Sequence, residues 1–361
     1  MANLPLQLDV MADSRDLRQP VPDDRARSPS FSIIVNNYNY AAFLDAAIRS
    51  ALTQTAADVE VIVVDDGSTD ASRDVIAAFR DAVVPVFKEN GGQASACNAG
   101  FRHARGDVVL FLDADDVLHP HCCATIAASG AFEGTASKVN FGLNKIDGSG
   151  RTIGGAYMAF PLPAGDFRPS LLDRGFMPTM PMSGNAFARH ALERIMPIPE
   201  PDYVYAADVA INNGVGLCGP VDAINEVLGS YRVHGSNASA QARGKAINLP
   251  GMKRRLDREQ ATDRLLHATA DDLSMHYAAG ALIETPAYCQ IAMIYARLSG
   301  ERARRPSFSR FLRSMGDHDI VLVKKAAIAA FMLAVRLAPR AIARQLVTRA
   351  IGTGLLFDRL T

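Results

Sequence analysis

Apolar residues recur with two different periods in the first third of the chain. Short runs of consecutive β-branched and aliphatic residues, such as Phe31–Val35, alternate with segments whose apolar positions lie three and four residues apart, as from Leu44 to Leu52. The runs predict strands over residues 31–35, 59–64, 83–87 and 108–112, and the spaced positions predict helices between them. Because each strand is apolar throughout, we expect a mostly parallel α/β sheet covered by helices on both faces.

The later part of the chain has a weaker pattern. Pro and Gly are frequent from Gly148 to Pro181, which predicts a long loop region. Two further strands are expected at Val221–Val227 and Ser230–Val233. From Met252 onward the apolar spacing becomes helical, and prolines 286, 306 and 339 mark breaks between the helices.

Length and composition describe a chain that can bury a sizeable core. The 361 residues are 48% hydrophobic and 21% charged. The 38 basic and 38 acidic residues give a net charge of zero, so no overall field attracts nucleic acid, and we expect no nucleic-acid partner. The charges are unevenly spread, because residues 301–361 hold twelve basic and four acidic residues. The tail is therefore basic and the remainder acidic.

The cysteines and the apolar stretches near both chain ends indicate the cellular compartment that we expect for this protein. Five cysteines without a C-x-x-C pair indicate reduced thiols in the cytoplasm. Residues 1–30 contain five aspartates and no uninterrupted apolar core, so we expect a flexible leader and neither a signal peptide nor an anchor. The longest uncharged apolar stretch of the basic tail, Ala326–Val335, has ten residues, whereas a membrane-spanning helix needs about 20.

The tail also contains an apolar segment with basic residues. Ile320–Leu337 is apolar almost all round except for Lys324, Lys325 and Arg336, and further arginines follow it. Such helices suit packing on the rest of the chain or on a second copy of it. They also suit peripheral contact with an anionic membrane surface, and both alternatives stay open.

Carboxylates gather where two of the predicted strands end. Residues 59–64 run directly into Asp65 and Asp66, and residues 108–112 run into Asp113, Asp115 and Asp116. Ligands of open α/β sheets bind beyond the carboxyl ends of the strands. A single aspartate there can equally be a turn or cap residue, but three within four residues repel one another unless a cation lies between them. Oxygen ligands favour Mn²⁺ or Mg²⁺.

Four sequence blocks then carry a family resemblance. They are FSIIVNNYN at 31–39, VVDDGSTD at 63–70, NGGQASACNAG at 90–100 and FLDADD at 111–116. In this order and spacing they resemble family 2 inverting glycosyltransferases, which have the GT-A fold. A looser similarity continues with Ala207-Asp208, where the family usually has Glu-Asp, and with the segment Tyr231–Asn237.

The resemblance implies an organisation and a set of roles. It implies a GT-A domain at 31–244, with a nucleotide-sugar half at 31–130 and an acceptor half at 131–244, followed by a helical region at 245–361. Asp208 would be the catalytic base, and Asp115 and His234 would hold the metal, with His234 alternatively near the diphosphate. The nucleotide-sugar would be bound by residues including Asp66 at the base and Asp113 at the ribose, and the whole set is Asn36, Tyr38, Asp66, Asn90, Asp113 and Asp115. Asp116 and Lys88 would support these contacts.

The implied function is metal-dependent transfer of a sugar, with inversion, from a nucleotide diphosphate donor to a hydroxyl acceptor. UDP is the commonest donor nucleotide in the family, and the acceptor would be a surface polysaccharide or a lipid-linked glycan. Two alternatives remain. A sugar nucleotidyltransferase shares the fold and ligand but has a glycine-rich segment after the first strand, where this chain has residues 36–39 without glycine. A non-catalytic scaffold subunit would explain Ala207 in place of Glu.

Overall fold

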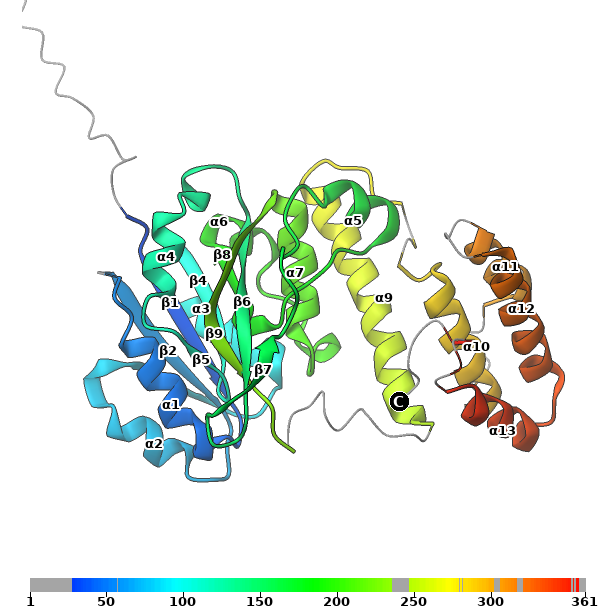
Figure 1. Ribbon diagram of the computed structural model, residues 1–361, viewed down its shortest axis with the longest axis horizontal. Coiled ribbons are helices and arrows are strands. Elements are labelled where there is room, and N and C mark those ends of the chain that lie inside the picture. The colour runs from blue at the N-terminus through cyan, green and yellow to red at the C-terminus, as the bar shows by residue number, and fades with distance from the viewer. Residues whose placement is uncertain are drawn as a thin grey trace, which may run out of the picture.

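The strands form one mixed sheet in the computed structural model, which describes residues 28–56, 58–235, 247–278, 280, 282–301, 306–316, 321–351, 353 and 355–356. Within these residues the strand order is β3-β2-β1-β4-β8-β6-β9-β5, and β7 pairs with β6 (Figure 1). The strands are β1 (Phe31–Asn37), β2 (Val59–Asp66), β3 (Val84–Lys88), β4 (Val108–Asp113), β5 (Val117–Leu118), β6 (Lys138–Ile146), β7 (Thr152–Ala156), β8 (Asn185–Ala188) and β9 (Val221–Arg232).

The first four strands are parallel, as their continuous apolar sequences predicted. Central β1 pairs with β2 on one side and with β4 on the other, and β2 pairs with β3. β8 then runs antiparallel to β4, and β6 and β9 form a parallel pair farther along the sheet. The parallel half therefore brings the carboxyl ends of β1, β2 and β4 to one edge.

Helices cover both faces of the sheet. Alternating side chains of β1 point to opposite sides, so that Ile33 packs with helices α1 and α4 while Ile34 packs with α3 and α7. The α-helices are α1 (Ala41–Leu52), α2 (Ser72–Ala78), α3 (Gln93–His103), α4 (Cys122–Ala128), α5 (Arg168–Arg174), α6 (Arg189–Ile195) and α7 (Ala207–Cys218). Short 3-10 helices lie at η2 (Arg80–Ala82), η3 (Ala131–Glu133), η4 (Met182–Gly184) and η5 (Glu200–Asp202).

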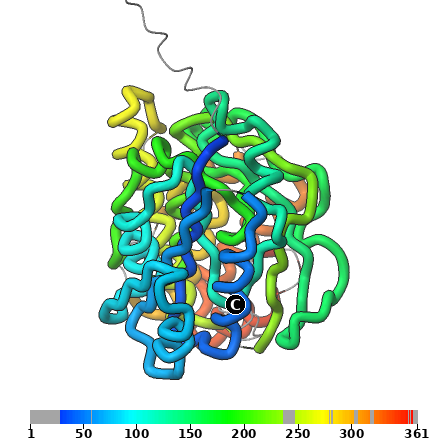
Figure 2. The backbone as a smooth tube through the Cα atoms, turned by 90° about the vertical axis from the view of Figure 1, so that its left-hand side faces the viewer, coloured from blue at the N-terminus to red at the C-terminus, as the bar shows by residue number. Residues whose placement is uncertain are grey.

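A second group of helices follows the sheet. They are α9 (Leu249–Asp272), α10 (Pro286–Ser299), α11 (Phe308–Gly316), α12 (Leu322–Leu337) and α13 (Arg340–Ala350). Asn248 caps α9 by accepting the N–H of Gly251 at 2.9 Å, and Thr285 caps α10 by accepting the N–H of Tyr288 at 3.2 Å. Helix α9 packs against α7 on one side and α10 on the other, and Figure 2 shows the later helices behind the sheet.

The structure confirms most predicted elements and corrects two. The long loop expected from Gly148 to Pro181 contains strand β7 and helix α5, so that prediction was wrong in part. The two strands expected at 221–227 and 230–233 form the single strand β9. Prolines 286, 306 and 339 do precede or begin helices α10, α11 and α13.

Some expectations fall outside the described residues. These are residues 1–27 of the expected leader, the boundary between 244 and 245, and Ser236 and Asn237 of the looser similarity. All five cysteines are free, and all but Cys218 are buried. Within the described part of the chain, no helix combines the length and the apolar character that a membrane crossing requires.

Candidate functional site

The register of the parallel strands sets the candidate site. Asn36 near the end of β1 lies beside Asp113 at the end of β4, and Asp66 at the end of β2 lies beside Lys88 at the end of β3. The polar residues predicted from strand ends thus share one edge of the sheet. This edge is where ligands of open α/β sheets bind.

Asp66 organises the loop after β3. Its carboxylate accepts from Lys88 Nζ at 2.6 Å, from the backbone N–H groups of Gly91 at 3.0 Å and Gly92 at 2.7 Å, and from Asn90 Nδ2 at 3.2 Å. Asp66 is 2% exposed, so these donors compensate its buried charge. Asp66, Asn90 and Lys88, chosen from sequence as separate contacts, therefore form one unit.

Gly92 ties this loop to the opposite side of the site. Its φ is +86°, and a Cβ added there would meet backbone atoms of Val204 within 2.8 Å. The next residue, Gln93, donates its backbone N–H to Val204 O at 2.9 Å. Only glycine fits this position because both the φ and the close approach exclude a side chain.

The end of β1 leaves two amide oxygens without a hydrogen bond. Asn36 donates from Nδ2 to Cys97 Sγ at 3.3 Å, and Asn37 donates from Nδ2 to Asp65 Oδ1 at 3.0 Å. The Oδ1 atoms of both asparagines are buried and have no partner within the described structure. Tyr38 follows with 46% of its surface exposed. The strand end therefore offers acceptors and an accessible aromatic ring.

Asp113, Asp115 and Asp116 form the acidic centre of the edge. Burial and the charges of Asp115 and Asp208 raise the pKa of Asp113 to about 8. Burial and the two neighbouring aspartates also raise the pKa of Asp116. Asp115 Oδ2 lies 3.0 Å from His234 Nε2, so the predicted metal pair is in contact. Three carboxylates, two of them with a raised pKa, therefore lie together at this edge.

Arg232 fastens this acidic loop, and the sequence analysis did not assign it a role. At the end of β9 its backbone N–H donates to Asp116 Oδ1 at 2.8 Å, and its Nε donates to Asp115 O at 2.7 Å. The guanidinium lies 5.0 Å from the ring centre of Phe43. Its place in the segment Tyr231–Asn237, which resembles the family, is a signal that could have pointed to it.

Aromatic rings enclose His234. Its ring centre lies 4.7 Å from that of Phe43 and 5.7 Å from that of Tyr40. Burial, together with the charges of Asp115 and Asp113, raises the pKa of Tyr40 to about 12. These packing contacts fix the imidazole with its Nε2 atom toward Asp115.

Asp208 stands at the start of α7, after Ala206 with a φ of +66°. Burial raises the pKa of Asp208, while the N–H of Val209 and the charge of Arg258 act in the opposite direction. Gln93 bridges the two sides of the site, because its Oε1 accepts from Ala207 N at 2.9 Å and its Nε2 lies 3.5 Å from Asp113 Oδ1. Asp208 thus neighbours the acidic centre.

Lys138 is a second residue that the sequence analysis left without a role. This first residue of β6 is fully buried and donates to Asn212 Oδ1, while its Nζ lies 5.6 Å from the ring centre of Phe187. Asn212 in turn donates from Nδ2 to Asp208 O at 2.8 Å. Burial lowers the pKa of Lys138 to about 7, although the charge of Asp208 opposes this shift.

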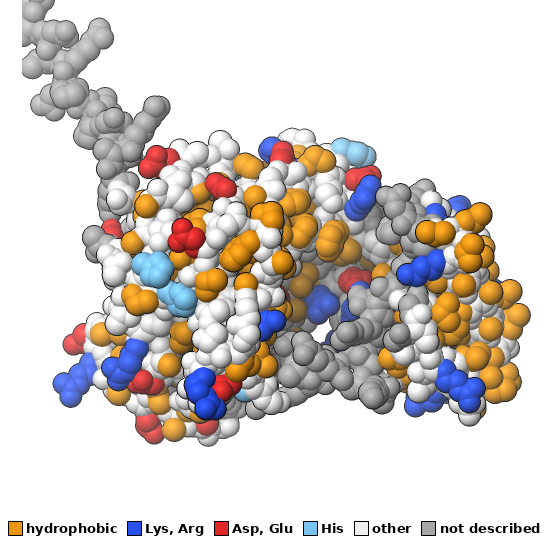
Figure 3. Space-filling view, viewed as in Figure 1, with side chains coloured by type: hydrophobic (Ala, Val, Ile, Leu, Met, Phe, Trp, Pro, Cys, Tyr) orange, Lys and Arg blue, Asp and Glu red, His pale blue; other side chains and the backbone are white. Residues whose placement is uncertain are grey.

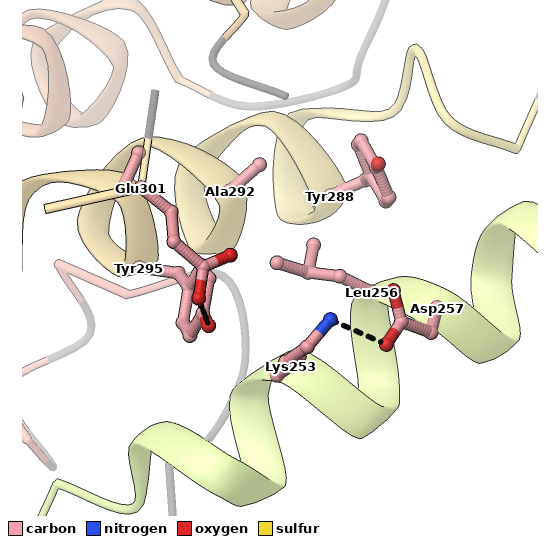
Figure 4. Close-up of a pocket in the computed structure, with 8 residues that line it drawn as sticks. Lys253, Leu256, Asp257, Tyr288, Ala292, Tyr295 and Glu301 are labelled. Atoms are coloured by element: carbon pink, nitrogen blue, oxygen red, sulfur yellow. Dashed lines mark hydrogen bonds and ion pairs between the residues drawn. The ribbon is translucent and has the colours of Figure 1, made fainter. Parts of the chain in front are cut away.

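A cavity in the later helices lies apart from the strand edge. It has a volume of about 210 Å³ and lies between α9 and α10 (Figure 4). Its charged side chains pair locally, with Lys253 Nζ 3.1 Å from Asp257 Oδ2 and Tyr295 donating to Glu301 at 2.7 Å. No strand-end residue lines it, so we place no chemistry there.

Comparison with known proteins identifies the family of this chain. The sequence model described as "Glycosyl transferase family 2" matches residues 32–152. An uncharacterized glycosyltransferase of Nostoc sp., alr2836, is 39% identical over 235 residues, which are 62% of this chain and 72% of that protein. The chain belongs to glycosyltransferase family 2.

This glycosyltransferase is also similar to a glucosyltransferase in sequence and to a solved structure in fold. Validoxylamine A glucosyltransferase of Streptomyces hygroscopicus subsp. limoneus is 36% identical over 118 residues, which are 31% of this chain and 26% of that protein. The structure of S. aureus TarS 1–349 with UDP-GlcNAc superposes with a TM-score of 0.56 at 15% identity, covering 91% of this chain and 93% of that one. The predicted GT-A fold is thereby confirmed.

Few side chains of this glycosyltransferase are placed to bind a metal ion. Within the described residues, no group of three or more His, Cys, Asp or Glu side chains is gathered as a metal site. The contact between Asp115 and His234 supplies one carboxylate oxygen and one imidazole nitrogen. These two donors suit Mn²⁺ or Mg²⁺ when a phosphate-bearing ligand completes the coordination.

Proposed function

We propose that this glycosyltransferase transfers a sugar, with inversion and with a divalent cation, from a UDP-sugar to a hydroxyl acceptor. The observation that carries the proposal is the meeting of Asp208 with Asp113 and Asp115 at one strand edge, where the charges of Asp115 and Asp208 raise the pKa of Asp113. An inverting transfer needs donor-side acidic residues and an acceptor-side base within one site.

Asp115 and His234 would hold the cation, Mn²⁺ or Mg²⁺. When bound, the cation offsets negative charge on the diphosphate leaving group. The fit rests on the 3.0 Å contact between the two side chains and on the carboxylates of Asp113 and Asp116 beside Asp115. Asp116 and Arg232 would keep Asp115 in position through their own hydrogen bond at 2.8 Å.

The donor would lie along the ends of β1, β2 and β4. The unpartnered Oδ1 atom of Asn36 can accept an N–H or hydroxyl of the nucleotide, and the exposed ring of Tyr38 can pack on it. Asp113 would bind the ribose. Asp66 would contribute by holding Asn90 and Lys88 in place, because its carboxylate is occupied by that loop.

Asp208 would accept the proton of the attacking hydroxyl. A carboxylate whose pKa is raised by burial is a stronger base than an exposed one, and this suits proton abstraction near neutral pH. Gln93 would keep the start of α7 close to the donor carboxylates. The usual neighbouring glutamate is replaced by Ala207, so Asp208 would act alone.

Substrates and setting complete the proposal. TarS was solved with UDP-GlcNAc, which supports a UDP donor. The acceptor would be a surface polysaccharide or a lipid-linked glycan, in the cytoplasm or at its membrane. Residues 31–130 would bind the donor and 131–244 the acceptor. Residues 245–361 would reach the acceptor side through Arg258 of α9, whose charge acts on Asp208.

Calorimetric titration tests donor and metal together. UDP, GDP and dTDP are titrated into the full chain with and without Mn²⁺. We expect micromolar binding of UDP that needs Mn²⁺ and falls at least about tenfold in Asp115→Ala, because the cation loses a ligand. Asp166→Asn removes an exposed carboxylate paired with Arg168 and serves as the control. Absence of nucleotide binding under every metal condition would contradict the proposal.

Turnover then separates the enzyme from its alternatives. Asp208→Asn should bind UDP normally and lose about 10²- to 10⁴-fold of transfer, because proton abstraction is lost. Proton NMR of the product with the matching donor sugar should show the inverted anomer. Retained configuration would disprove inversion, and unchanged turnover in Asp208→Asn would remove it as the base. Pyrophosphate release from UTP and a sugar phosphate would instead favour a nucleotidyltransferase.

A further inference from the structure

Helix α12 leaves apolar side chains on its outer surface. The residues at its start, Val321, Leu322 and Val323, are 75%, 79% and 78% exposed. Leu337 at its end is 72% exposed, and Leu333 is 43% exposed. In Figure 3 apolar side chains, with Lys and Arg between them, cover the end of the molecule where α11 and α12 lie.

These side chains form a continuous stripe. From Val323 the exposed apolar positions follow a helical spacing, which is 323, 326, 327, 330, 333, 334 and 337. The opposite face of α12 is buried through Ile328, Met332 and Val335, which pack in the core of the later helices. Helix α12 is therefore apolar on both faces, and only one face is covered in this structure.

Basic residues surround the stripe. Residues 321–351 contain Lys324, Lys325, Arg336, Arg340, Arg344 and Arg349 and no acidic residue. Each of these side chains except that of Lys325 is exposed. Ile342 on α13 adds an exposed apolar side chain, at 48%, among the arginines.

We propose that α12 and α13 dock this enzyme on an anionic lipid bilayer surface, with the stripe entering the interface and the basic residues meeting the headgroups. The charge favours this occupant, since a cationic face attracts acidic lipids and repels a second copy of itself. The helices would lie on the surface, because α12 spans only 16 residues. The inference is independent of the sugar donor and of Asp208.

Flotation of the full chain with liposomes tests the docking. Vesicles containing phosphatidylserine are compared with pure phosphatidylcholine vesicles at low and high salt. We expect binding to the anionic vesicles that weakens with salt. Leu322→Asp/Leu337→Asp should lower the bound fraction at least about tenfold, because two charges would enter the apolar interface.

A matched variant controls for charge. Ile153→Asp/Phe176→Asp makes the same kind of change in β7 and in the loop after α5, at side chains that are 42% and 60% exposed, and it should float like the unmodified chain. Circular dichroism checks that both variants fold. Equal flotation of the two double variants, or no flotation with anionic vesicles, overturns the proposal. So does a dimer in sedimentation that Leu322→Asp/Leu337→Asp dissociates, because the stripe would then face a second copy.

Discussion

At the scale of a single residue, the buried side chain of Lys138 makes the free energy of unfolding depend on pH. Lys138 is fully buried, and its surroundings favour the neutral amine, with a pKa near 7 against the ordinary 10.5. Below about pH 7 the folded and unfolded chains both hold the proton. Between about 7 and 10.5 the unfolded chain retains the proton that the folded chain releases, so the free energy of unfolding rises with pH.

Lys138→Met should abolish this rise. Relative to the variant, the unmodified chain should gain at most about 1.4 kcal/mol of unfolding free energy per pH unit above pH 7. Urea unfolding followed by circular dichroism at several pH values measures the difference. Lys145→Met removes a lysine from the same strand at a half-buried position and serves as the control. Parallel pH profiles for Lys138→Met and the unmodified chain would contradict the prediction.

Single residues also differ in how far the sequence revealed them. Asp66, Asp113 and Asp115 were found because aspartates that directly follow apolar strands must lie at the sheet edge. Lys138 could not be found in this way, since its burial depends on α7 and β8, which approach from elsewhere in the chain. The bridging role of Gln93 likewise requires Ala207 and Asp113 to be brought together by the fold.

Helix α3 shows how one element depends on close packing. Gly100 lies in the buried part of this helix, where an added Cβ would meet Ile34 Cγ2 at 2.3 Å and Val64 Cγ2 at 3.1 Å. The absent side chain lets α3 lie directly on β1 and β2. That approach also sets the position of Gln93 at the start of the same helix.

Gly100→Ala should lower the free energy of unfolding by about 1–3 kcal/mol, because overpacking against β1 outweighs the better helix propensity of alanine. Urea denaturation provides the measurement. Gly155→Ala is the control, since nothing lies within 4 Å of a Cβ there, and it should stay within about 0.5 kcal/mol of the unmodified chain. A Gly100→Ala variant that is more stable than the unmodified chain would contradict the prediction, because α3 could then move away from β1 at no cost.

The same scale explains why β7 and α5 were missed. Strands β1, β2 and β4 were predicted because parallel strands buried on both faces leave a continuous apolar signal. Edge strand β3 was predicted from its β-branched and aromatic residues, although Val84 and Phe87 are exposed. Strand β7 is an exposed edge strand and α5 buries one leucine, Leu171, so neither leaves such a signal. Gly229 interrupts the apolar pattern of β9, which made one strand look like two.

Helix α9 joins the sheet to the later helices at the scale of the whole molecule. Ala261 and Leu266 pack in the clusters around α7 and α5, while Met252 and Leu256 pack with α10. Tyr203 reinforces the first of these contacts with a buried hydrogen bond of 3.0 Å to Thr262. The long helix thus takes part in apolar clusters on both sides.

Leu266→Ala should lower the free energy of unfolding by about 2–5 kcal/mol, because it removes a fully buried side chain beside α7. Since α9 also packs with α10, we expect one calorimetric transition that shifts as a whole. Arg254→Ala changes an exposed position of the same helix and should have little effect. A second transition that keeps its temperature in Leu266→Ala would mean that the later helices unfold independently.

The free cysteines are spread through the layers of this molecule. Cys97 lies in α3, Cys122 and Cys123 lie in α4, Cys218 lies in α7, and Cys289 lies in α10. Burial raises the pKa of each thiol, and only a thiolate reacts readily with alkylating reagents. The order in which these thiols are alkylated therefore reports the order in which α3, α4, α7 and α10 become accessible to solvent.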